Sequence, residues 1–197
     1  MNPGQNATGL ENLVFHHLTA AQARDRRTEV EDIFRGSYIR AIDTGEKFES
    51  PDAFMHRFDA YTSPSRAAGF ELVIAELDGH TCGQAWGWPL PENTAWWGGL
   101  ELDEENAAEF TAENGSRTFA LSEIMVRSEL TGRGIAHALH NELLDARPEP
   151  RATLLVRPDN SRAYTTYRKW GWHRVGTLKP SWPDAPTFDV LIRDLPT

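Results

Sequence analysis

A glycine-rich segment in the second half of the chain has the composition of an anion-binding loop. Residues 131–136 read Thr-Gly-Arg-Gly-Ile-Ala and join a strand-like stretch to a helix-like one. Gly132, Gly134 and Ala136 leave the main chain bare where the helix begins. Free N–H groups at a helix N-terminus bind phosphate with help from the helix dipole, and Arg133 adds positive charge. The segment is therefore either a phosphate-binding loop or a turn that only packs a helix against its strand.

Two other kinds of phosphate loop do not fit this segment. A P-loop needs a Gly-Lys-Ser/Thr sequence, which the chain lacks here. A dinucleotide fingerprint has three spaced glycines and usually opens a longer doubly wound sheet. The part of the chain that follows the loop is too short for such a sheet.

A second candidate group lies on the next predicted helix. Asn160 is a good N-cap, and Gly171 fits the position that follows a helix end. Asn160, Ala163, Tyr164 and Tyr167 recur at i, i+3, i+4 and i+7, which places them on one helix face. A phenol on a face that meets the crossover loop could reach a bound ligand, whereas an isolated tyrosine is more often part of an amphipathic core.

In this order and spacing, the two segments resemble the GNAT superfamily of acyl-CoA-dependent N-acyltransferases. The family's cofactor loop reads Arg/Gln-x-x-Gly-x-Gly/Ala, and Gly134 and Ala136 match it. Thr131 stands where the family has Arg or Gln, which removes a side chain from the diphosphate region but leaves the main-chain cradle. The family's later motif, Asn-x-x-Ala-x-x-x-Tyr-x-x-x-Gly-aromatic, is matched in full from Asn160 to Trp172. The resemblance covers roughly residues 12–194.

The resemblance implies acetyl-CoA as the acyl donor and assigns residues to it. In the family, the pantetheine arm enters between splayed parallel strands four and five and pairs with exposed main chain. Strand four would be residues 118–126, so that Ile124, Met125 and Val126 would hold pantetheine, and Asn160 would meet its thioester end. The diphosphate would lie on Gly132, Arg133, Gly134, Ile135, Ala136 and His137.

The implied reaction is direct attack of an amine on a thioester. An alkylammonium ion must lose a proton before or during the attack. Glu123, in the same strand, is the candidate base, directly or through water; its alternative is a carboxylate at a solvated rim or beside an arginine. Tyr167 stands where the family's acid stands and would protonate the leaving thiolate. Main-chain N–H near Val126 could polarise the thioester carbonyl.

Aromatic residues indicate where the acceptor would bind. Trp86 and Trp88 lie on a predicted hairpin where this family builds its acceptor pocket, and Trp182 lies between the last two strands. A pocket of this kind suits a bulky or flat acceptor, although core packing explains most aromatic residues. The acidic stretch 91–116 either attracts a cationic amine or forms a solvated surface.

The elements that must position these residues predict an α/β fold. It is a GNAT-like mixed sheet of about six or seven strands with splayed parallel strands four and five, flanked by about four helices. A flexible tail, residues 1–11, precedes a single domain, residues 12–197. Helices are expected over 20–42, from Ser50 onward, over 132–147 and over 160–169. Strands are expected over 13–18, 70–77, 80–88, 118–126, 152–157, 172–178 and 188–192.

Composition limits the partners. The net charge of −9 disfavours nucleic acid, and no apolar run is long enough to cross a membrane. Cys82 is the only cysteine, which excludes an intrachain disulfide and indicates a reducing cytoplasmic protein. His137 and His140 lie three residues apart without an evident third ligand, so no metal is expected.

Several alternatives remain at this level. The acyl donor could be a longer acyl-CoA or an acyl carrier protein, because Thr131 leaves the diphosphate contact open. The chain could also be a non-catalytic acyl-CoA sensor. The expected acceptor is a small-molecule amine, and the expected assembly is a monomer or a homodimer.

Overall fold

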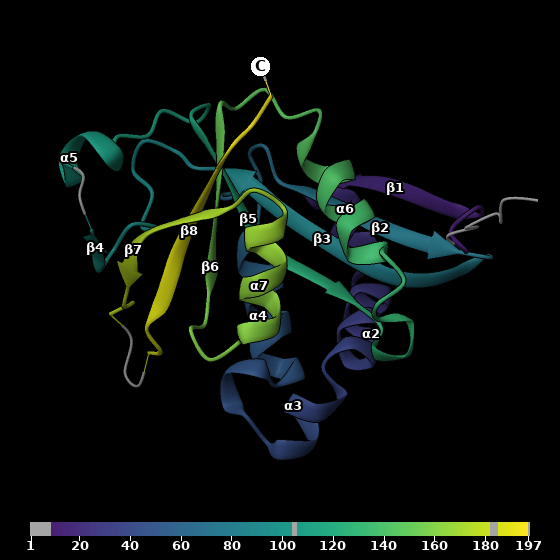
Figure 1. The fold of residues 1–197 in the computed structure, drawn as a ribbon. Coiled ribbons are helices and arrows are strands. Elements are labelled where there is room, and N and C mark those ends of the chain that lie inside the picture. The colour runs from purple at the N-terminus through teal and green to yellow at the C-terminus, as the bar shows by residue number, and fades with distance from the viewer. Residues whose placement is uncertain (1–8, 104–105, 182–184, 197) are drawn as a thin grey trace, which may run out of the picture. The chain divides into compact units, whose positions relative to one another are not determined.

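The computed structural model of the 197-residue chain describes residues 9–103, 106–181 and 185–196. Figure 1 draws the chain as a ribbon with its elements labelled, and contacts within the chain divide it into two compact units. Unit 1 comprises the residues up to Gly87 together with Glu123–Leu143. Unit 2 comprises Trp88–Ser122 and the residues from Leu144 onward. The expected tail falls mostly on residues 1–8, which lie outside the described part, and Trp182 lies outside it as well.

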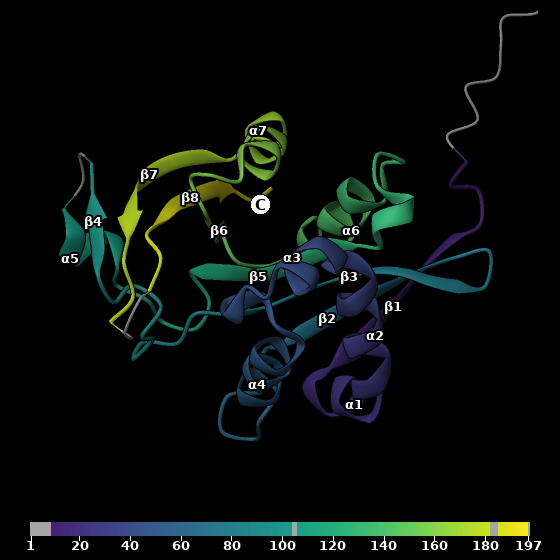
Figure 2. The same cartoon turned by 90° about the horizontal axis from the view of Figure 1, so that it is seen from below.

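Unit 1 holds most of the helices. Its elements are β1 (Leu13–Thr19), α1 (Ala20–Asp25), α2 (Arg27–Ser37), α3 (Ile39–Thr44), the 3₁₀ turn η1 (Lys47–Glu49), α4 (Pro51–Tyr61), β2 (Glu71–Leu77), most of β3 (His80–Pro89), the second half of β5 (Thr118–Val126), the 3₁₀ turn η2 (Ser128–Leu130) and α6 (Ile135–Leu144) except its last residue. β1 and β2 pair antiparallel, as do β2 and β3. Figure 2 shows α6 on one face of these strands and α1, α2 and α4 on the other.

Local sequence signals begin and end these elements. Thr19 forms a capping box with Gln22 at the start of α1, and the Ser50 hydroxyl accepts from the Ala53 N–H at the start of α4. The hairpin between β2 and β3 turns at Asp78 and Gly79, whose φ values of 52° and 80° are those of a type I′ turn. The expected cap, helix start and hairpin are therefore confirmed.

The expectation of one helix over residues 20–42 was wrong. The segment forms three helices, because the main chain leaves the helical region at Arg26 (ψ 21°) and at Tyr38 (ψ 28°). Before the second break, the Ser37 hydroxyl donates to the Ile33 carbonyl at 2.7 Å. A side chain that hydrogen-bonds to the helix main chain in this way often bends the helix. The apolar spacing alone did not reveal these breaks.

Of the described elements, unit 2 holds the remaining strands and two helices. Its elements are the last two residues of β3, β4 (Leu100–Leu102), α5 (Ala107–Phe110), the first half of β5, β6 (Arg151–Val156), α7 (Ser161–Lys169), β7 (His173–Leu178) and β8 (Phe188–Asp194). The strands follow the order β5-β6-β8-β7-β4. β5 and β6 are parallel, and the remaining pairs are antiparallel.

The counts of strands and helices need correction. The described residues form one eight-stranded sheet rather than six or seven strands, and seven α-helices rather than about four. β4 is a three-residue strand in the long connection after β3, too short to show any periodicity, and it pairs with β7. α5 has four residues, and the break-up of 20–42 adds two helices. The predicted α/β mixed sheet is confirmed, with β5 and β6 as the predicted strands four and five.

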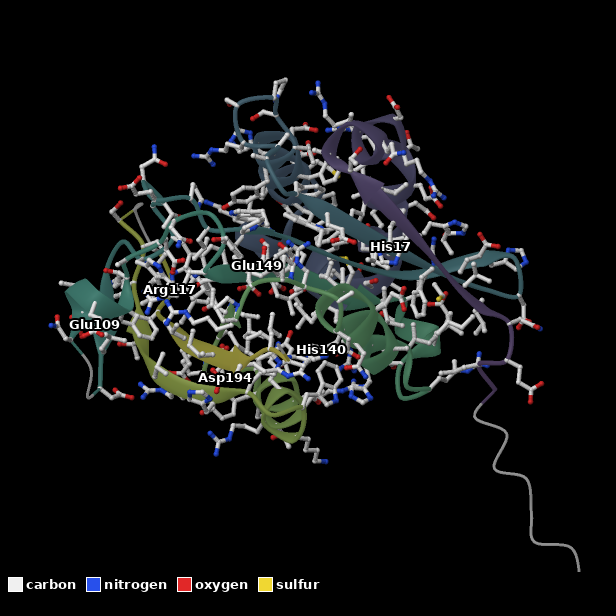
Figure 3. All side chains as sticks on the ribbon, turned by 90° about the horizontal axis from the view of Figure 1, so that it is seen from above. His17, Glu109, Arg117, His140, Glu149 and Asp194 are labelled. Atoms are coloured by element: carbon white, nitrogen blue, oxygen red, sulfur yellow. The ribbon has the colours of Figure 1, made fainter. Side chains whose placement is uncertain are left out.

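The acidic connection before β5 is partly buried in unit 2. Glu113 accepts hydrogen bonds at one oxygen from the Thr118 hydroxyl (2.7 Å), Arg151 (3.1 Å) and the Trp97 indole (3.2 Å). Arg117 donates to three main-chain carbonyls of residues 109–112, and Figure 3 labels it near α5. Glu113 is therefore held to the sheet, whereas the other described acidic residues of the stretch (Glu92, Glu101, Asp103 and Glu109) are exposed, as expected of a solvated run of charges.

Candidate functional site

The end of β5 is anchored before the glycine-rich loop begins. The Arg127 N–H donates to the Cys82 carbonyl at 2.9 Å, and its Nε donates to the Thr81 carbonyl at 2.8 Å. The same guanidinium forms an ion pair with Asp32 on α2. Ser128 donates from its hydroxyl to the carbonyl of Ser37 at 3.1 Å. The loop therefore starts from a fixed point, and sequence reasoning had given Arg127 no role.

The loop itself has the main-chain geometry of an open turn. Gly132 and Gly134 have φ values of 84° and 91°, a region that L-residues other than glycine rarely adopt. A Cβ atom at Gly132 would meet no described heavy atom within 4 Å. Residues 131–134 are exposed. The Thr131 hydroxyl donates to the Ser128 carbonyl at 2.9 Å, so this side chain supports the loop from within.

The start of α6 follows directly. Ile135 is buried, Ala136 is half-buried and His137 is exposed. The rings of His137 and His140 stack with centroids 6.2 Å apart; Figure 3 labels His140 on α6. Arg133 donates to the Gly9 carbonyl at 3.0 Å. The loop and the first turn of a ten-residue helix thus present main-chain N–H groups that could bind a diphosphate.

β5 supplies three of the other predicted cofactor residues. Met125 is buried and accepts a hydrogen bond at sulfur from the Gln84 amide at 3.3 Å, while Ile124 and Val126 are half-buried. Within unit 2, the parallel register of β5 with β6 comprises three pairs, from Thr118↔Arg151 to Ala120↔Thr153. Both strands continue beyond that ladder.

Glu123, in unit 1, is largely buried and contacts one basic side chain. Its side chain is 15% exposed, and its Oε1 accepts from Nη2 of Arg57 on α4 at 3.4 Å. Burial raises the pKa of Glu123, and the positive charge of Arg57 opposes that shift without cancelling it. A carboxylate of this kind is a stronger base than an exposed one.

The partner of Glu123, Arg57, was missed by sequence reasoning, as were the residues near Arg57. Arg57 donates from Nη1 to the Phe48 carbonyl at 2.9 Å, and its guanidinium lies 4.4 Å from the centre of the Phe48 ring. Burial raises the pKa of Tyr61, which also responds to the charges of Arg57 and Glu123. In the sequence, Arg57 comes three residues after Phe54 on the amphipathic helix α4. This spacing, which places the two residues near each other on the helix, is the one sequence signal that could have identified Arg57.

Unit 2 positions the second predicted catalytic residue. The Tyr167 ring lies edge-on to Trp170 and Trp172, with centroids 5.8 and 6.2 Å apart. Its carbonyl accepts from the Trp172 N–H at 3.1 Å, after Gly171 has ended α7 with a φ of 87°. Asn160 caps α7, because its Oδ1 accepts from the Ala163 N–H at 3.1 Å. The predicted helix and both of its caps are confirmed.

The tryptophans predicted to contact the acceptor occupy different environments. Trp86 is 0% exposed and lies in the aromatic cluster of unit 1, with Phe54, Phe58, Tyr61 and Phe70 around it. Trp88 belongs to unit 2, is 9% exposed and contacts Trp96 edge-on. In the structure, Trp86 is therefore part of the hydrophobic core of unit 1.

Unit 1 therefore brings together Glu123, residues 124–126 and the loop, while unit 2 holds Asn160, Tyr167 and Trp88. Within the described residues, no group of three or more His, Cys, Asp or Glu side chains is placed to hold a metal. Among those residues, no helix combines the length and apolar character that a membrane span requires.

Comparison with known proteins identifies the family of this fold. The acetyltransferase (GNAT) family model matches residues 28–172, which include the loop, Glu123, Asn160 and Tyr167. No curated protein matches the chain.

Solved structures show the same fold at low sequence identity. An acetyltransferase from Thermus thermophilus is 14% identical, with a TM-score of 0.61, and the match covers 94% of this chain and 99% of that one. A GNAT family acetyltransferase from Elizabethkingia anophelis with acetyl-CoA bound is 14% identical, with a TM-score of 0.57 and the same coverage. A chimera of the Vibrio cholerae spermidine N-acetyltransferase SpeG and hSSAT is 15% identical, with a TM-score of 0.57 and coverage of 93% and 96%.

Proposed function

The chain belongs to the acetyltransferase (GNAT) family, and we propose that it transfers an acetyl group from acetyl-CoA to the amine of a small molecule. The observation that carries this proposal is the loop 131–136, where Gly132 and Gly134 adopt positive φ between β5 and α6. The bare main chain at the start of the helix fits a diphosphate. The acetyl-CoA bound to the Elizabethkingia anophelis protein supports the choice of donor.

The donor would bind along β5 and the loop. Its pantetheine arm would pair with the main chain of Ile124, Met125 and Val126, in a part of β5 beyond its ladder with β6. Its diphosphate would lie on the N–H groups of residues 132–137. Asn160, whose Oδ1 is used in capping α7, would offer its amide N–H groups to the thioester end.

The chemistry needs one base and one acid. Glu123 would take the proton of the ammonium group, directly or through water, and the raised pKa that its burial causes suits this task. The amine nitrogen then forms a bond to the acetyl carbon and loses its second proton to water, which can return a proton to Tyr167, as the carbon–sulfur bond breaks. Tyr167 would give its phenolic proton to the departing thiolate.

We also propose that residues 12–197 act as a single acyltransferase domain, because the family match at 28–172 draws on both units. The one cysteine, Cys82, is free and buried, which suits the proposed reducing cytoplasm. The assembly is proposed to be a monomer or a homodimer.

Calorimetric titration with acetyl-CoA, CoA and pantetheine tests the donor. We expect micromolar binding of acetyl-CoA and CoA and much weaker binding of pantetheine, because only the first two carry the diphosphate. A screen of amines that detects thiol release then tests turnover. Equal binding of pantetheine would favour a carrier-bound donor, and no binding of any of the three would overturn the acetyl-CoA proposal.

A further inference from the structure

One ion pair in unit 1 differs from its neighbours. Arg57 on α4 contacts Glu123 on β5 through a single hydrogen bond of 3.4 Å from Nη2 to Oε1. Arg27 on α2 instead binds Asp59 through two N–H groups, each at 2.9 Å. A bidentate fork is the strong arrangement of an arginine with a carboxylate. The single long contact leaves other N–H groups of Arg57 able to bind a second carboxylate.

Arg57 is nevertheless held in place. Its Nη1 donates to the Phe48 carbonyl at 2.9 Å, and its guanidinium lies over the Phe48 ring at 4.4 Å. The side chains of Arg57 and Glu123 remain 21% and 15% exposed. A fixed and largely desolvated guanidinium with some surface open to solvent has the properties of an anion-recognition group.

The electrostatics of Glu123 agree with this interpretation. In a tight structural ion pair, the arginine lowers the pKa of its carboxylate partner. Burial instead raises the pKa of Glu123 despite Arg57, with the nearby charge of Glu49 adding to the rise. The exposed Arg66, whose guanidinium lies 5.7 Å from the centre of the Tyr61 ring, and Glu49 add one more charge of each sign to this part of unit 1. Such a mixture suits a zwitterion better than a polycation.

We propose that Arg57 determines acceptor specificity by binding a carboxylate, so that the preferred acceptor resembles an α-amino acid. This rests on the proposed function, in which Glu123 is the base that receives the proton of the acceptor amine. One carbon separates the amine from the carboxylate in an α-amino acid. Both groups can therefore reach Glu123 and Arg57, whose contacting atoms lie 3.4 Å apart. A polyamine would place a cation beside Arg57, which is electrostatically unfavourable.

Matched acceptor pairs test this proposal. Each pair consists of an amino acid and its amide, for example phenylalanine with phenylalaninamide and leucine with leucinamide, and spermidine serves as the polyamine. Thiol release gives kcat/KM for each acceptor, and the value for the acid is divided by the value for its amide. This ratio in the wild type is then divided by the same ratio in Arg57→Gln, which gives a double ratio. This double ratio removes the difference in intrinsic amine reactivity.

We expect the double ratio to be at least about ten, which corresponds to about 1.4 kcal/mol, with the loss in Arg57→Gln appearing mainly in KM. Arg57→Lys keeps the charge and is expected to retain part of the preference. Arg27→Gln is the matched control, because it removes an arginine whose fork is already occupied by Asp59. That variant should show the wild-type ratio. Thermal melting confirms that each variant is folded.

The outcomes separate this proposal from the proposed function. If thiol is released from acetyl-CoA but the double ratio is near one, the proposed role of Arg57 is overturned, and the proposed acetyltransferase activity is still supported. If acetyl-CoA binds but no acceptor of the panel turns over, each amino acid and its amide are titrated calorimetrically into the CoA-bound protein, and their two affinities test the role of Arg57. Tighter binding of the acid, lost in Arg57→Gln, supports the proposal, and equal or absent binding overturns it. Failure to bind acetyl-CoA would overturn both.

Discussion

At the scale of single residues, Tyr167 and Tyr164 form a matched pair on α7. Tyr167→Phe keeps the ring contacts with Trp170 and Trp172 but removes the proton that the thiolate would receive. We expect kcat to fall by about a hundredfold or more, with the Kd of CoA nearly unchanged. Thiol-release kinetics and calorimetry measure the two quantities. Tyr164→Phe should leave both at wild-type values, and equal losses in the two variants would point to packing rather than acid catalysis.

Glu123 leads to a prediction about pH. Burial raises the pKa of this carboxyl group, and a base acts only when it is deprotonated. The value of kcat/KM should therefore increase with pH, and this rising limb of the pH profile should lie at higher pH than the pKa of an ordinary glutamate would give. Glu123→Gln should abolish this limb and lower the rate by about a hundredfold or more. A pH profile of both proteins is the measurement, and a limb that persists in the glutamine variant would assign the ionisation to another group.

At the scale of elements, the loop between β5 and α6 should bind through its main chain. Gly134 has a φ of 91°, so Gly134→Ala strains the loop by about 1 kcal/mol although the new methyl group meets only ordinary contacts. We expect the affinity for CoA to fall about tenfold by calorimetry. Gly45→Ala is the control, because Gly45 has a φ of 72° at the end of α3 and open space around it. Equal CoA affinity in the two variants would contradict a cradle at Gly134.

His17 connects three elements of unit 1. Its ring, labelled in Figure 3, contacts Glu71 on β2 at 2.6 Å and Glu142 on α6 at 2.8 Å, and the hydrogen bond to Glu71 raises the pKa of His17. Stability from the charged ring is fully present below the ordinary histidine pKa of about 6.5 and is lost as pH rises through the raised value. His17→Gln should lower the melting temperature at acidic pH but not at alkaline pH. The effect should stay below about 1 kcal/mol, because these groups are partly exposed.

At the scale of the whole molecule, the chain crosses between the two units inside regular elements. It does so between Gly87 and Trp88 in β3, between Ser122 and Glu123 in β5, and at the end of α6. A strand cannot unfold over half its length without disturbing the other half, so we expect one cooperative transition.

Core truncations in each unit measure this cooperativity. Phe58 in unit 1 and Phe119 in unit 2 are both fully buried. Phe58→Ala and Phe119→Ala should each destabilise the whole protein by about 3–5 kcal/mol. Fluorescence and far-ultraviolet circular dichroism should then report the same shifted midpoint. Two transitions, of which each variant moves only one, would show that the units unfold separately.

The sequence alone determined the features that are encoded within a few neighbouring residues. The caps at Thr19, Ser50 and Asn160, the Asp78–Gly79 turn and the glycines of the loop all act through local hydrogen bonds or local backbone freedom. The order of these signals was enough to predict the family and the α/β fold. The roles assigned to Glu123, Tyr167 and the cofactor residues remain predictions.

Tertiary structure decided what depends on residues far apart in the chain. Arg57 and Glu123 are separated by 66 positions, and no local pattern links them. The three-residue strand β4 exists because β7 pairs with it, and Trp86 is a core residue because aromatic side chains of α4 and Phe70 surround it. Local propensity is a weak determinant where a segment is short or where burial depends on distant side chains. For this reason the cofactor loop could be found in the sequence, whereas the candidate acceptor site around Arg57 could not.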